Sequence, residues 1–282
     1  MTAFLYAVRI WLLDSEDRPI CPATGVIIED GDGVFLYTCW HVVTGINFLD
    51  LKVPHNAWPP SRRKIKYQTQ AIETPNPAVV TFGGGVDRVV PLYRENDGTF
   101  IPLWQQERNS IACPDLAHVG LKVPKFFDLV RIPIQIEQAE EARISIPRSA
   151  ISKNMIGPSG KVIVVGYPYG YSIRGARWPH PVHIMRFVAA EMSDTLTMLL
   201  DAEAAPGMSG APVFIESKHP LPGGNQWDLL GVYTGAVFAD AEHLQQLQPS
   251  EGRPPSNDRR AALGVVCSLH LAEAIGGLGK SS

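Results

Sequence analysis

Short apolar runs separated by glycine- and proline-rich turns constrain the fold of this chain more than any other feature. The runs are rich in Val, Ile, Tyr and Thr, and 25 glycines and 24 prolines among 282 residues supply the breaks between them. Such residues favour strands, whereas Gly and Pro mark turns. The pattern predicts antiparallel β-barrels, with expected strands at 4–12, 22–29, 33–38, 117–123, 161–165, 184–190, 196–201, 212–215, 228–236 and 262–267. Two segments, 54–77 and 245–259, are expected to be long loops.

Composition and charge exclude several classes of function. Hydrophobic residues make up 45% of the chain and charged residues 19%, which is typical of a folded globular protein. The net charge of −3 argues against a general affinity for nucleic acids or anionic membranes. No run of residues approaches the ~20 apolar residues of a membrane span. The apolar segment 1–13 contains Arg9 and fits a first strand better than a signal peptide.

The segment Ala205-Pro206-Gly207-Met208-Ser209-Gly210-Ala211-Pro212 predicts a serine on a tight turn. Gly207 permits backbone conformations that a side chain would forbid. The backbone N–H groups of Gly207 and Ser209 would then point to one place beside the serine Oγ. A nucleophile with hydrogen-bond donors where an oxyanion forms is what acyl transfer requires.

A serine nucleophile needs a base and an acid elsewhere in the chain. The candidate base is His41, which follows the strand-like run 34–37 at the point where a turn begins. The candidate acid is Asp115, at the start of the apolar run 116–123, where a carboxylate can orient an imidazole. Asp87, which follows three consecutive glycines, is the alternative acid.

In these three motifs the chain resembles a trypsin-like serine peptidase of the chymotrypsin superfamily, closest in pattern to its compact bacterial members. The matching segments are Thr38-Cys39-Trp40-His41, Asp115-Leu116-Ala117 and Pro206 to Pro212, in the family's order His, Asp, Ser. The resemblance implies two six-stranded antiparallel β-barrels, at 1–130 and 150–268, with a linker at 131–149 and a C-terminal helix within 269–282. It also implies a serine endopeptidase that cleaves protein or peptide substrates through an acyl-enzyme intermediate, without a cofactor.

The same resemblance suggests substrate-binding residues and a mode of control. Glu203, six residues before Ser209, occupies the place where trypsins select basic side chains. Tyr233, Thr234 and Gly235 would line the pocket and pair with the substrate backbone. Met208 stands where animal trypsins carry an aspartate that binds a newly cleaved N-terminus. Activation by cleavage is therefore not expected, and the alternatives are a preformed site or one switched by a regulatory protein partner or a loop movement.

The four cysteines, Cys21, Cys39, Cys113 and Cys267, show no paired spacing and no metal-ligand spacing. We therefore expect buried thiols, a reducing cytoplasmic setting and no bound metal. Cys39 and Cys113 each lie two residues before a proposed catalytic residue, so the two thiols are expected near the site.

Three other interpretations of the sequence are alternatives to the endopeptidase. The first is a catalytically silent fold of the same type that binds a peptide or a partner in its groove. The second is an esterase or amidase with the same chemistry and a different pocket. The third is an α/β-hydrolase with His270 as base, but Ala211 replaces the last glycine of that family's Gly-x-Ser-x-Gly motif and no alternating helices and strands surround Ser209.

Overall fold

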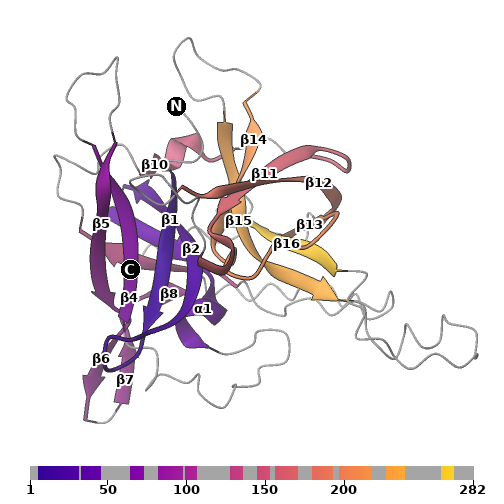
Figure 1. The fold of residues 1–282 in the computed structure, drawn as a ribbon. Coiled ribbons are helices and arrows are strands. Elements are labelled where there is room, and N and C mark those ends of the chain that lie inside the picture. Colours follow the sequence, from indigo (N-terminus) through magenta and orange to yellow (C-terminus); the bar gives the residue numbers. More distant parts are fainter. Residues whose placement is uncertain are drawn as a thin grey trace, which may run out of the picture.

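The computed structural model describes residues 6–31, 33–45, 64–72, 82–97, 99–106, 128–135, 145–152, 156–170, 180–192, 197–217, 227–238 and 262–269. Its described elements are nearly all strands, and most of them belong to two large sheets that lie side by side (Figure 1). The fold is all-β, as the sequence predicts, with one sheet closed into a barrel beside an eight-stranded sheet.

The first sheet contains eight strands in the order β5-β4-β1-β2-β3-β9-β8, and β10 pairs with β2 outside this path. Their bounds are β1 Ala7–Leu13, β2 Pro19–Asp30, β3 Gly33–Thr38, β4 Lys64–Ile72, β5 Phe82–Pro91, β8 Gln105–Gln106, β9 Val130–Ile134 and β10 Ile146–Pro147. A separate hairpin joins β6 (Tyr93–Asn96) to β7 (Thr99–Pro102). The short helix α1 (Trp40–Thr44) follows β3, and a 3₁₀ turn η4 (Arg148–Ala150) follows β10.

The second sheet is a closed barrel in the order β11-β12-β13-β16-β15-β14. The bounds are β11 Lys161–Gly166, β12 Val182–Met192, β13 Thr197–Leu200, β14 Ala211–Glu216, β15 Trp227–Phe238 and β16 Ala262–Ser268, with a 3₁₀ turn η5 at Pro168–Gly170. Side chains alternate between its two faces, as strand geometry requires. Val213 and Ile215 of β14 pack inside the barrel, whereas Phe214 between them packs toward the first sheet.

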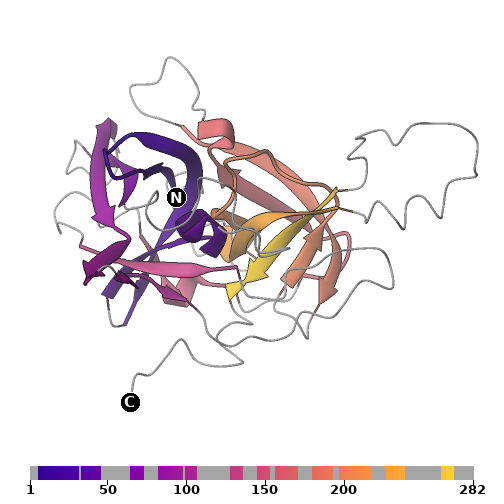
Figure 2. The ribbon, with the colours of Figure 1, turned by 90° about the horizontal axis from the view of Figure 1, so that it is seen from below.

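An apolar layer joins the two sheets. It contains Val26 and Tyr37 from the first sheet and Val165, Phe214 and Val232 from the barrel, all buried. Seen from below, the indigo and magenta strands of the first sheet lie beside the orange and yellow strands of the barrel (Figure 2). Because both sheets bury side chains against each other, they fix the relative position of residues carried at their facing ends.

Some details differ from the sequence prediction. The barrel has the six strands expected, but the first sheet has eight, because β8 and β10 add to it. Residues 131–134, assigned to the linker, form most of β9, and β4 lies within the expected loop 54–77. The expected strand at 117–123, the loop at 245–259 and the helix within 269–282 lie outside the described residues, apart from Leu269. No helix in the described ranges has the length and apolar character needed to cross a bilayer.

Candidate active site

His41 lies on α1, a single helical turn that starts immediately after β3. Thr38 closes β3 and is fully buried, and its hydroxyl donates to the carbonyl of Thr24 in the neighbouring strand (2.9 Å). Val42 and Val43 anchor the other face of α1 in the first sheet's core. Gly45 ends the turn with a φ of 74°, a left-handed conformation suited to glycine. His41 is therefore held at the end of a strand, with a quarter of its side chain exposed.

Asp128 reaches His41 because of the register between β3 and β9. Thr38 pairs with Val130 in an antiparallel ladder. Following β3 forward and β9 backward from this pair leads to His41 and Asp128 at the same end of the sheet. The Asp128 side chain is 1% exposed, so its carboxylate lies in a site almost without solvent.

Ser209 lies on the turn between the segment that follows β13 and the start of β14. Gly207 and Gly210 both have a φ of 89°, which L side chains adopt only at a cost. A Cβ on Gly210 would lie 1.9 Å from the carbonyl oxygen of Thr24, so only glycine lets the turn approach β2 this closely. The need for glycine at positions 207 and 210, which the sequence singles out, is therefore steric.

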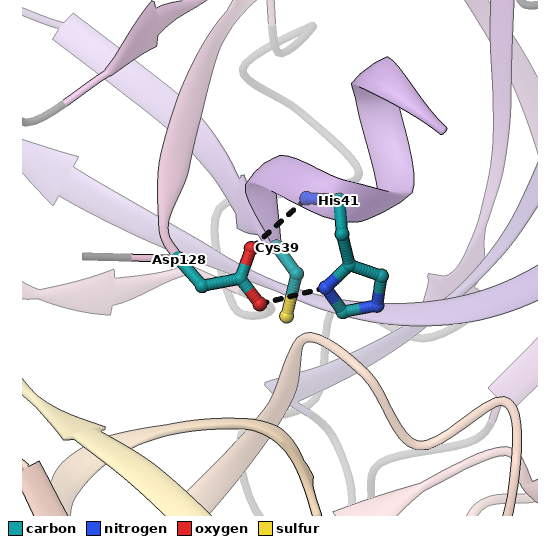
Figure 3. A group of neighbouring side chains, drawn as sticks. All are labelled: Cys39, His41 and Asp128. Atoms are coloured by element: carbon teal, nitrogen blue, oxygen red, sulfur yellow. Dashed lines mark hydrogen bonds and ion pairs between the residues drawn. The ribbon is translucent and has the colours of Figure 1, made fainter. Parts of the chain in front are cut away.

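A chain of hydrogen bonds links these three side chains. Asp128 accepts from His41 twice, from Nδ1 at 2.6 Å and from the backbone N–H at 2.9 Å (Figure 3). On the opposite side of the ring, His41 Nε2 lies 3.1 Å from Ser209 Oγ. Since the carboxylate accepts at Nδ1, that nitrogen carries the proton and Nε2 is free to accept one from the serine.

The backbone around Ser209 presents donors beside its hydroxyl. Within the described part of the chain, the N–H groups of Gly207 and Ser209 have no hydrogen-bond acceptor, whereas that of Met208 donates to Ala205 (3.1 Å) and that of Gly210 to Tyr233 (2.8 Å). Gly207 and Ser209 are the residues whose amides the sequence assigns to an oxyanion. Their unpaired N–H groups leave those donors available.

Thr24 of β2 connects the first sheet to the serine turn. Its hydroxyl donates to the carbonyl of Gly207 (2.9 Å) and accepts from the N–H of Tyr167 (3.0 Å). Its backbone N–H donates to the carbonyl of Ser209 (3.0 Å). This buried threonine thus holds the turn next to the strand that leads to His41. The sequence reasoning missed it, because its partners are distant in the chain.

Replacing Thr24 with valine is expected to destabilise the protein by about 1–3 kcal/mol, because the Tyr167 N–H and the Gly207 carbonyl lose a buried partner. Valine keeps the shape of threonine, so the loss isolates the hydroxyl. Urea denaturation of both proteins measures the change. The control is Thr24→Ser, which retains the hydroxyl and should be the more stable of the two variants. Equal stability of the valine and serine variants would contradict this role.

Cys39 lies with its side chain beside the contact between His41 and Asp128 (Figure 3). Its side chain is fully buried, and its thiol donates weakly to the carbonyl of Tyr233 (3.5 Å). Burial raises the pKa of this thiol well above its usual value, and the nearby Asp128 carboxylate adds to the rise. At neutral pH the group is therefore a thiol. Cys113, expected nearby from the sequence, lies outside the described residues.

The predicted substrate-binding residues fall at one end of the barrel. Tyr233 is buried, its hydroxyl accepts from the N–H of Ala204 (2.8 Å), and burial raises its pKa to about 12. Thr234 is fully buried and donates to Val265. The Tyr233 side chain therefore supports the segment before Ser209, whereas Thr234 contacts β16. The carbonyl of Glu203 accepts from the guanidinium of Arg186 (2.8 Å), so a cation lies beside the residue expected to select basic side chains.

β15 presents a backbone edge near Ser209. Its pairing with β14 ends at Tyr233, whereas its pairing with β16 continues to Phe238. Among the described strands, none pairs with the other edge of β15 beyond Tyr233. Gly235 lies on this stretch with a φ of 152°, next to a bulge.

The acids proposed from the sequence have different outcomes. Asp115 lies outside the described residues, and the carboxylate bound to His41 belongs to Asp128. Asp87, the alternative, lies on β5 and pairs with Lys66 (3.4 Å), away from His41. A signal for Asp128 was present, because Asp128-Leu129 precedes the β-like run 130–134 as Asp115-Leu116 precedes 117–123.

Comparison with known proteins finds a likeness in structure and none in sequence. No protein-family model matches the sequence, and no curated protein matches it. Among solved structures, the fold is similar to that of a thermostable serine protease from an extremophilic microorganism. The match covers 94% of this chain and 91% of that one, with 8% sequence identity and a TM-score of 0.45. A likeness at this level does not assign the chain to a family or an activity.

Proposed function

We propose that this protein is a serine endopeptidase with Ser209 as nucleophile, His41 as general base and Asp128 as the residue that orients His41. The observation that carries the proposal is the hydrogen-bond chain from Asp128 through His41 to Ser209, with contacts of 2.6 and 3.1 Å. A nucleophile within hydrogen-bond reach of a base, itself oriented by a third group, is the arrangement that activates a hydroxyl.

In the proposed reaction, Ser209 Oγ attacks a carbonyl carbon of the substrate while His41 Nε2 takes its proton. The carbonyl oxygen becomes an oxyanion that accepts from the amides of Gly207 and Ser209. His41 then donates the proton to the leaving amine, which leaves an acyl group on Ser209, and a water molecule repeats the sequence to release the acid. The Asp128 carboxylate stabilises the imidazolium throughout.

A peptide is the substrate that the surroundings of Ser209 favour. The edge of β15 beyond Tyr233, with which no described strand pairs, offers backbone donors and acceptors to an extended chain, which would add to the sheet as a further strand. This edge would align a peptide backbone beside the nucleophile. A small ester would make no use of it.

A fluorophosphonate probe tests the proposed nucleophile. Its phosphorus forms a bond to Ser209 Oγ and loses fluoride, and His41 accepts the hydroxyl proton, so labelling requires an activated serine. We expect mass spectrometry to place the label on Ser209 in the wild type and to find none in Ser209→Ala. Ser159→Ala, at an exposed turn outside the site, is the matched control and should label normally. Absence of labelling in the wild type would favour the silent, peptide-binding alternative.

A further inference from the structure

Cys39, His41 and Asp128 bring three kinds of metal ligand together. The Cys39 sulfur, a ring nitrogen of His41 and a carboxylate oxygen of Asp128 all lie within 4.8 Å of one another. Figure 3 shows the sulfur beside the contact between His41 Nδ1 and the carboxylate, on the side of the ring away from Nε2. The proposed hydrolysis gives Cys39 no task. Thiolate, imidazole and carboxylate are the three ligand types that zinc uses in proteins.

We propose that Cys39, His41 and Asp128 form an inhibitory binding site for a thiophilic divalent cation, with Zn²⁺ as the expected ion. Tetrahedral zinc, with bonds of about 2.0–2.3 Å, sets its ligand atoms about 3.5 Å apart. The contact between Nδ1 and the Asp128 carboxylate, now 2.6 Å, must widen by about 1 Å, and a pair of ligand atoms near the 4.8 Å limit must close by a similar amount. Small rotations of the three side chains supply such changes.

Charge favours a dication at this place. Two of the three ligands, the Cys39 thiolate and the Asp128 carboxylate, are anions when they bind metal. Together they neutralise the two charges of Zn²⁺, so the site buries no net charge, which is the condition for burying ions at acceptable cost. His41 completes the set as a neutral ligand.

Protons balance when the ion binds. Before binding, one proton is on the Cys39 sulfur and one on His41 Nδ1. The metal displaces both, and the neutral imidazole keeps a single proton, now on Nε2. One proton is therefore released to solvent for each cation bound, as expected when a thiol becomes a ligand.

The position of the site allows solvent to complete the coordination. Cys39 and Asp128 are buried, but His41 is partly exposed, so the ion reaches the site past the imidazole. Three protein ligands leave a fourth position for water.

Binding of the ion would stop the proposed hydrolysis, and this consequence rests on the proposed function. With the metal on Nδ1, Nε2 carries the proton and faces Ser209 as a donor. It then has no lone pair to accept the serine proton, so the general base is lost. The binding itself does not depend on whether the protein is a peptidase.

Cobalt absorption spectroscopy of the full chain tests the site without an activity assay. Co²⁺ takes zinc-like ligands and gives a thiolate-to-cobalt charge-transfer band when sulfur is bound, and Zn²⁺ should displace it. We expect one Co²⁺ per chain with this band in the wild type and in Ser209→Ala. The band should disappear in Cys39→Ala and Cys39→Ser, and Asp128→Asn should weaken binding by more than about tenfold, because an anionic ligand is lost.

Cys21→Ala is the matched control, because Cys21 lies in the same sheet but outside the cluster. It should keep the band. A wild-type protein without the band, or a band that persists in both Cys39 variants, overturns the proposal. Circular dichroism melting identifies any variant that has not folded. Asp128→Asn keeps the thiol and therefore tests the site independently of the Cys39 variants.

A second measurement separates this proposal from the proposed function. Peptide hydrolysis by the wild type should fall at least tenfold as Zn²⁺ saturates the site, and the ratio of activity with and without Zn²⁺ should approach one in Cys39→Ala. Cobalt binding without any hydrolysis would leave the metal site standing and remove the peptidase. Hydrolysis without cobalt binding would support the peptidase and overturn the metal site.

Discussion

Alanine in place of Ser209 or His41 is expected to lower kcat for a peptide substrate by about 10⁴–10⁶-fold. Each substitution removes one partner of the contact between His41 Nε2 and Ser209 Oγ (3.1 Å). The two residues act as a unit, so the double variant should lose no more than the more damaging single variant. Residual hydrolysis would come from substrate binding and from the amides of Gly207 and Ser209.

Steady-state kinetics on a fluorogenic peptide, with thermal melting to show that each variant is folded, measures this effect. His183→Ala, on β12 and away from the hydrogen-bond chain, is the control for loss of an imidazole and should keep wild-type kcat. Losses that multiply in the double variant would mean that the two residues act separately. A His41→Ala protein with near-normal kcat would remove the proposed base.

The barrel could be read from the sequence largely because its strands carry their own signals. The expected strand at 161–165 corresponds to β11 (Lys161–Gly166), and that at 262–267 to β16 (Ala262–Ser268). In β11, Val162 and Val164 pack in the barrel interior and Val165 packs toward the first sheet, and the apolar run of β16 is likewise buried on both faces. Such runs are recognisable without knowledge of the neighbouring strands.

The first sheet was harder to predict, because some of its strands are polar on one face. β4 begins Lys-Ile-Lys-Tyr-Gln-Thr, and of these six residues Ile65, Tyr67 and Thr69 are buried. β5 begins with Phe82 and three glycines, which indicate a loop when read alone. These strands exist because they pair with each other and with β1, and pairing partners are not visible in a local window.

In the candidate site too, some residues have local sequence signals and others are placed by strand pairing. The surroundings of His41 and Ser209 are local motifs, so the sequence singles them out directly. The partner of His41 depends instead on which strand lies beside β3 and in which register. Asp115 and Asp128 both precede Leu and an apolar run, and only the pairing of Thr38 with Val130 brings Asp128 to the imidazole. Thr24 was hidden for the same reason, since it contacts Gly207, 183 positions away.

Asparagine in place of Asp128 is expected to lower kcat by about 10⁴-fold near neutral pH. The side chain keeps its shape, and its oxygen can still accept from the backbone N–H of His41. Its amide group, however, is a donor that faces Nδ1, so the imidazole must hold its proton on Nε2 instead. In that tautomer Nε2 no longer accepts the Ser209 proton, and the imidazolium also loses its buried counter-charge.

Asp115→Asn is the matched comparison, because it makes the same change at the other Asp-Leu pair. We expect its kcat to stay within about threefold of the wild type, a difference of less than 1 kcal/mol in the activation free energy. Kinetics of the two variants on one peptide, at equal stability by thermal melting, decides between the acids. A large loss in Asp115→Asn with normal activity in Asp128→Asn would mean that the strand beside β3 in the active enzyme is not 130–134. The pairing of Thr38 with Val130 would then be wrong, and with it the site proposed for zinc, whereas the roles of His41 and Ser209 would stand.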